Sequence, residues 1–137
     1  MVYTKEYKIT TDRDSLQDIA AEVNETIKES GIRNGIVTVE TTEEATGIFK
    51  IASLGKEVQD DIVREMRRIV PARINFYHQD SPENAAGQIK NCLFGSSVSL
   101  ILKEGKLLCE GKQIVCYADY DGPRERSYHV CVIGEKE

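Results

Sequence analysis

The chain has 137 residues, of which 40% are hydrophobic and 30% charged, proportions typical of one soluble globular domain with a sizeable core. The formal net charge of −5, with no stretch dense in Lys and Arg, argues against a nucleic-acid or membrane-surface partner. Four cysteines without C-x-x-C spacing favour neither a zinc site nor disulfides, and the lack of a signal-like or membrane-spanning stretch favours the cytoplasm.

Hydrophobic periodicity predicts the order of the elements. Strands show alternating apolar and β-branched side chains, whereas helices repeat apolar residues every three or four positions. In chain order we expect a strand (2–10), a helix (14–31), a strand (35–39), a polar loop or distorted strand (40–47), a helix (54–70), a short strand (74–77), a helix (81–95) and four strands (98–102, 106–109, 113–117 and 128–133). These elements predict one α+β domain over residues 1–137, with a largely antiparallel sheet and three helices on one face of it.

Two helix starts carry explicit capping signals. Asp14, followed three residues later by Gln17, resembles a capping box. The tripeptide Ser81-Pro82-Glu83 combines an N-cap serine, a proline at the first helical position and an acid in the first turn. The sequence therefore predicts that the first and third helices begin at these residues.

The stretch 119–126 joins the last two predicted strands and carries both acids and arginines. Asp-Gly-Pro indicates a tight turn, and hence a hairpin. Arg124 and Arg126 at this turn could grip a phosphate or carboxylate through two parallel hydrogen bonds. The alternative is that they form surface ion pairs with Asp119 and Glu125.

Histidine and glutamate side chains offer further candidates. His78 precedes a predicted helix N-terminus, where free backbone amides favour an anion, and it could act as acid, base or anion partner. His129 lies inside the last predicted strand and is expected to be a packed or surface residue. Glu43 and Glu44 in the polar loop could be a base or a metal ligand, or only solvated acids. From the residues alone we predict an anion-binding rim and no particular reaction.

Several motifs, in the same order and spacing along the whole chain, resemble the YjbQ family. They are Tyr77-His78 before the third helix, Gly95-Ser96-Ser97 after its Ile-Lys pair, the Gly-Lys-x₆-Gln spacing from Gly105 to Gln113, and Gly-Pro-Arg-x-Arg at 122–126. The resemblance implies a compact α+β protein, usually a homotrimer. It also implies secondary thiamine-phosphate synthase activity, which joins a thiazole phosphate to a pyrimidine diphosphate in a pocket near the subunit boundary.

The resemblance also implies roles for individual residues. His78 and Asp119 match positions expected to act in catalysis, although the family more usually has Glu at the second. Positions expected to bind the ligand are matched by Asn84, Gln113, Arg124 and Arg126.

Three other family positions carry different residues. Glu43 stands in place of a loop histidine, Gln88 in place of a helix histidine, and Lys112 in place of a tryptophan. Because an amide can only form hydrogen bonds, proton transfer at the helix position is lost. A divalent metal cofactor is possible, but the sequence does not imply one.

Three functions therefore remain open. The first is a synthase with reduced or altered catalysis that still binds a phosphorylated or anionic small molecule. The second is a non-catalytic homotrimeric binding or scaffold protein that keeps the fold. The third is a different enzyme on the same fold, in which Glu43 and His78 act together.

Overall fold

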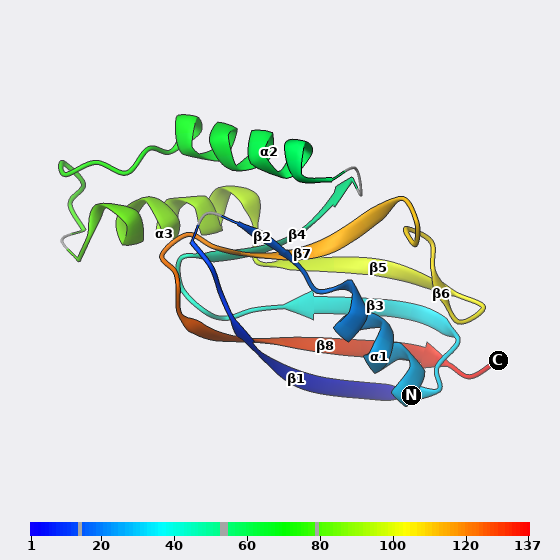
Figure 1. Cartoon of the computed structure of the whole chain (residues 1–137). Coiled ribbons are helices and arrows are strands. Elements are labelled where there is room, and N and C mark those ends of the chain that lie inside the picture. The colour runs from blue at the N-terminus through cyan, green and yellow to red at the C-terminus, as the bar shows by residue number, and fades with distance from the viewer. Residues whose placement is uncertain (14, 53–54, 79) are drawn as a thin grey trace.

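The structure is a computed structural model that describes residues 1–13, 15–52, 55–78 and 80–137. It confirms the predicted α+β class, with antiparallel sheets and three helices (Figure 1). The elements are β1 (Val2–Thr10), β2 (Leu16–Asp18), α1 (Ala20–Ser30), β3 (Asn34–Glu40), β4 (Thr46–Ala52), α2 (Lys56–Ile69), α3 (Pro82–Phe94), β5 (Ser97–Lys103), β6 (Lys106–Leu107), β7 (Gln113–Asp119) and β8 (Glu125–Glu135).

The larger sheet has five strands in the order β1-β8-β3-β5-β6. Its strands alternate between buried and exposed residues, as expected for a sheet with one face on the core. In β8, for example, Tyr128, Val130 and Val132 point into the core, whereas His129 and Ile133 point outward. The outer face of this sheet is therefore free of other elements among the residues that the structure describes.

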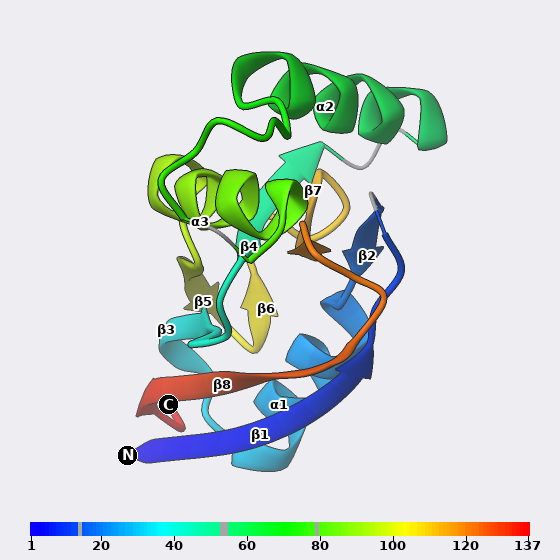
Figure 2. The same ribbon diagram turned by 90° about the vertical axis from the view of Figure 1, so that its left-hand side faces the viewer.

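The smaller sheet, in the order β2-β7-β4, is covered on both faces. One face packs with α1 against the large sheet, and the other packs against α2 and α3 (Figure 2). Burial on two sides explains the unbroken buried run 115–119 in β7. Burial also raises the pKa of the Cys116 thiol to about 12, so this cysteine behaves as a core side chain.

Two hydrophobic clusters hold these layers together. The first lies between the sheets and includes Ile19, Val23 and Ile27 around α1. The second lies between the small sheet and α2 and includes Leu16 and Met66. Partly buried members of the second cluster are Phe49, Ile62, Val63, Phe94 and Ile114.

The first helix begins later than its sequence suggested. Residues Leu16–Asp18 form β2, which pairs with β7, because their hydrophobic face is needed at the edge of the small sheet. The helix begins at Ala20, whose N–H donates to Asp18 Oδ1 at 2.8 Å. The Gln17 side chain instead contacts residues 10 and 12, so the capping-box interpretation is wrong for it, while Asp14 lies outside the described residues. The third helix, in contrast, has the predicted Ser81 cap.

Three further predictions differ from the structure. Among the described residues no strand forms over 74–77, where Ile74 and Tyr77 are exposed. The polar segment is followed by β4, a strand that we did not predict. The turn after Asp119 is not a hairpin, since β7 and β8 belong to different sheets. The helices accordingly lie in two layers and do not share one face of a single sheet.

Candidate functional site

A buried ion pair lies where the chain crosses from the small sheet to the large one. Asp119 ends β7, and Arg126 is the second residue of β8. The Arg126 guanidinium donates to both carboxylate oxygens of Asp119, from Nε at 2.9 Å and from Nη2 at 3.1 Å. The Thr11 hydroxyl and the Asp121 N–H donate to the same carboxylate at 2.6 and 3.0 Å. The ion pair with Asp119 is therefore formed, but it is buried instead of lying on the surface.

These donors fix the protonation state of Asp119. Burial alone would raise the pKa of this carboxyl, because the charged form loses hydration. The hydrogen bonds from Arg126, Thr11 and the Asp121 amide outweigh burial and hold the pKa of Asp119 below its ordinary value. Asp119 is thus ionised at neutral pH and is a poor general acid, and its catalytic role stays a prediction.

Glu43 fastens the loop between β3 and β4 to β8. Its Oε2 accepts hydrogen bonds from the Ser127 N–H at 2.9 Å and from the Ser127 hydroxyl at 3.1 Å. Its Oε1 lies 3.7 Å from Nη1 of Arg126. The Thr41 hydroxyl donates to the Ser127 carbonyl at 2.8 Å and anchors the same loop. Both carboxylate oxygens of Glu43 therefore interact with groups of the protein itself.

Asn84, in the first turn of α3, connects three segments of the chain. Its amide nitrogen donates to Asp121 Oδ2 at 2.9 Å and, more weakly, to Glu44 Oε1 at 3.4 Å. Its amide oxygen lies 2.8 Å from Nε2 of His78. Asn84 is buried, whereas the His78 side chain is half-exposed. His78 is therefore held at the rim of the cluster with one side open to solvent.

Gln88 and Arg124 complete the cluster. Gln88 lies one turn after Asn84 and donates to Glu44 Oε2 at 3.0 Å. Arg124 donates from Nε to the Asp121 carbonyl at 2.8 Å and from Nη2 to the Asp121 carboxylate at 3.1 Å. Arg124 therefore pairs with Asp121. Among the described contacts it does not pair with Glu125, a partner that the sequence left open.

Two predicted residues lie elsewhere. Gln113 begins β7 and Lys112 directly precedes it, so they lie six and seven residues before Asp119 and roughly 20 Å from it along an extended strand. They line a surface cavity of about 320 Å³ together with Ile101 of β5 and Leu108, which follows β6. Within one chain they cannot act together with the cluster around Asn84.

The cluster is acidic on balance. Its carboxylates are Glu43, Glu44, Asp119 and Asp121, and its guanidinium groups are Arg124 and Arg126. An anion entering here would meet more negative than positive charge, in contrast to the anion-binding rim predicted from sequence. Among the described residues, no group of three His, Cys, Asp or Glu side chains could hold a metal ion, and no helix is long and apolar enough to cross a membrane.

Some residues of this region carried little sequence signal. Thr11 ends a strand far from the turn that it stabilises, and nothing local marks it. Lys90 is buried on α3 together with Ala86 and Gly87. One sequence signal for this burial was available. Ala86 and Gly87 are small and lie one turn earlier, and helical residues three or four positions apart share a face. The large apolar residues at helical spacing in α3, Ile89 and Leu93, are exposed instead.

Acid should weaken the protein partly through Asp119. Its pKa is lower in the folded chain than the ordinary value of about 3.9, so its contribution to stability is complete above that pH and is lost as the pH falls through the folded value. We expect the Asp119→Asn variant to be less stable at neutral pH, with a melting temperature that declines less steeply than wild type below about pH 4. If the melting temperatures of the two proteins fell equally steeply with decreasing pH, the lowered pKa of Asp119 in the folded chain would be contradicted.

Known proteins match this chain over almost its whole length. The family model described as "UPF0047 protein YjbQ-like" matches residues 5–135. UPF0047 protein MJ1081 of Methanocaldococcus jannaschii is 33% identical, covering 95% of this chain and 94% of its own. UPF0047 protein YugU of Bacillus subtilis is 27% identical, with coverages of 91% and 94%.

Solved structures agree with the sequence relatives. A YbjQ-like protein of unknown function from Sulfolobus solfataricus superposes with a TM-score of 0.91 at 25% identity, covering 98% of this chain and 99% of its own. An uncharacterised YjbQ/UPF0047 protein from Clostridium acetobutylicum gives a TM-score of 0.88 at 29% identity, with coverages of 94% and 99%. The resemblance carried by the sequence motifs is confirmed, and this chain belongs to the YjbQ (UPF0047) family.

Proposed function

We propose that this chain is a homotrimeric binding protein of its family, in which synthase chemistry is reduced or lost. One observation carries this proposal: side chains at the positions expected to do chemistry bind other groups of the chain. Glu43 accepts a hydrogen bond from Ser127, Gln88 donates one to Glu44, and Arg126 donates to Asp119. A group that must exchange protons or grip a phosphate would first have to give up these structural bonds.

The geometry also bears on the alternative enzyme that pairs Glu43 with His78. Shared proton chemistry requires the two groups to lie within hydrogen-bond reach, directly or through one water. His78 is bound to Asn84, and Glu43 is bound to Ser127. Among the described contacts the two side chains do not meet, so this function has the least support.

Assembly is supported by an apolar row across the outer face of the large sheet. Val2, Ile133, Ile36 and Ile101 are direct neighbours on four adjacent strands and are each 51–67% exposed. A row of this kind, on a sheet face without covering elements, is characteristic of an interaction surface. A second copy of the chain is the occupant that we propose.

A second exposed apolar segment favours a ring. The 74–77 segment, in which Ile74 and Tyr77 are exposed, lies at the opposite end of the molecule from the β5–β6 region (Figure 1). Two unlike apolar surfaces suit a heterologous contact, which closes into a ring when the rotation allows it. Lys112 and Gln113 border the apolar row, so in a trimer they could act beside the cluster of another copy.

The test combines mass and turnover on the purified protein. Light scattering is expected to give three times the 15.4 kDa of one chain. A thiazole phosphate and a pyrimidine diphosphate, with Mg²⁺ present, are expected to yield no thiamine phosphate above background. A monomeric mass would contradict the assembly. Turnover would instead support the synthase, which the open side of His78 favours, provided that His78→Asn abolishes it while the mass stays unchanged.

A further inference from the structure

We infer that the cleft between α2 and α3 is a binding site for a phosphoryl group, separate from the acidic cluster. The cleft has a volume of about 300 Å³ and is lined by Arg13, Arg67 and Lys90, with Glu83 as its one described acid. The inference does not depend on the proposed trimer, because all three basic residues come from one chain. It places anion binding away from Arg124 and Arg126.

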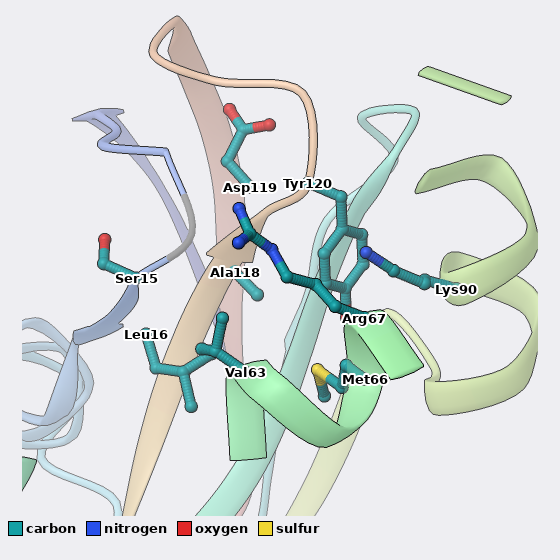
Figure 3. Close-up of a pocket in the computed structure, with 9 residues that line it drawn as sticks. All are labelled: Ser15, Leu16, Val63, Met66, Arg67, Lys90, Ala118, Asp119 and Tyr120. Carbon is teal, nitrogen blue, oxygen red and sulfur yellow. The ribbon is translucent and has the colours of Figure 1, made fainter. Parts of the chain in front are cut away.

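The three cations reach the cleft from three separate parts of the chain. Arg13 precedes β2, Arg67 is in the last turn of α2, and Lys90 is in α3. Figure 3 shows Arg67 and Lys90 on either side of the Tyr120 ring, in a smaller adjoining cavity that shares these three residues. Among the described residues that line the cleft, three are basic and one is acidic, whereas the protein as a whole has a net charge of −5.

Lys90 is the most unusual residue of the cleft. Lysine is rarely this deeply buried unless it is paired, and Lys90, which is 7% exposed, does interact with other groups of the protein. Its ammonium lies 5.2 Å from the centre of the Tyr120 ring, within the range of a cation–π contact. Burial and this contact fix the position of its positive charge beside an aromatic wall of the cleft.

Arg13 is held in place from the other side. Its Nε donates to the Gly122 carbonyl at 2.9 Å, so the turn that follows Asp119 orients its guanidinium at the mouth of the cleft. Arg67 and Lys90 also interact with other groups of the protein. A ligand must therefore outcompete internal contacts, which favours a doubly charged phosphate over a singly charged carboxylate.

The shape of the cleft adds to its charge. Its volume lies at the small end of the range for small-molecule sites, about 300–1,000 Å³. Arginine matches phosphate oxygens through paired N–H groups, and lysine supplies a compact charge. Tyr120 offers a ring surface beside these cations, and its hydroxyl is buried without a hydrogen-bond partner among the residues that the structure describes. Inorganic phosphate and an aromatic phosphate ester share this chemistry.

Isothermal titration calorimetry at low ionic strength tests the site with inorganic phosphate and with phenyl phosphate. We expect Lys90→Met and Arg67→Gln each to weaken binding by about tenfold or more, since each removes a charge-assisted contact. Arg67 is exposed, so its variant should keep the fold even if the Lys90 variant does not. Tighter binding of phenyl phosphate would identify an organic ester as the ligand class, and equal binding would identify free phosphate.

Two control variants separate this site from general electrostatics and from the acidic cluster. Arg68→Gln removes the same charge from the next residue of α2, which does not line the cleft, and should leave binding unchanged. Arg124→Gln should also leave it unchanged. Equal losses in Arg67→Gln and Arg68→Gln, a loss confined to Arg124→Gln, or no binding of either compound would overturn the inference.

Discussion

Replacing Arg126 with leucine is expected to lower the free energy of unfolding by about 3–5 kcal/mol. The substitution leaves the Asp119 carboxylate buried, with hydrogen bonds from Thr11 and the Asp121 amide but without a compensating charge. Urea denaturation followed by circular dichroism measures the change from the shift in midpoint at constant slope.

Two further variants distinguish the loss of a buried ion pair from the loss of an exposed one. Arg124→Leu breaks an ion pair whose arginine is 54% exposed, so it should cost less than about 1 kcal/mol. Combining Arg126→Leu with Asp119→Leu should recover part of the loss, because no buried charge then remains unpaired. If Arg126→Leu and Arg124→Leu had equal, small effects, the Asp119–Arg126 pair would not be buried in solution.

The second large effect concerns assembly. Ile36→Lys places a charge in the middle of the apolar row, between Ile133 and Ile101. The side chain is already about half-exposed in the single chain, so the fold should survive, whereas a charge buried at an interface without a partner is strongly unfavourable. We expect the mass measured by light scattering to fall threefold, to that of one chain.

A matched substitution elsewhere controls for the loss of an exposed apolar side chain. Leu93→Lys, on α3, exchanges a side chain of similar exposure away from the outer face of the large sheet, and the trimer should persist. An unchanged mass for Ile36→Lys, with melting temperatures that show both variants folded, would exclude the apolar row from the interface.

Local signals in the sequence predicted local structure well. The Ser81 cap, Pro82 and the small residues after them specify α3 through contacts a few residues apart, and the structure has that helix at the expected place. Helix α2 and the main strands of the large sheet follow from periodicity for the same reason.

Long-range partners explain most of the differences. Residues 16–18 form a strand because β7, about a hundred positions later, offers them an edge. Long-range pairing also explains the turn after Asp119. Its sequence suits a hairpin, but β7 pairs within the small sheet and β8 within the large one.

The candidate site was predictable only in part. Asp119, Arg124 and Arg126 carry chemistry in a recognisable turn, yet their choice of partners depends on Thr11 and Asn84, which approach from distant elements. Lys90 was harder to find, because only the small residues one turn earlier in α3, Ala86 and Gly87, indicate that its face of the helix packs inward.

The position of β8 has a consequence for how the protein acquires its fold. This strand is formed by the last residues of the described chain, yet it lies between β1 and β3, which come from the first forty. During synthesis the N-terminal strands therefore leave the ribosome long before the strand that must separate them. Such distant pairings make folding slow relative to helical proteins of this size. The large sheet can close only after translation has delivered β8. Until then β1 and β3 expose unpaired edges, which favour aggregation.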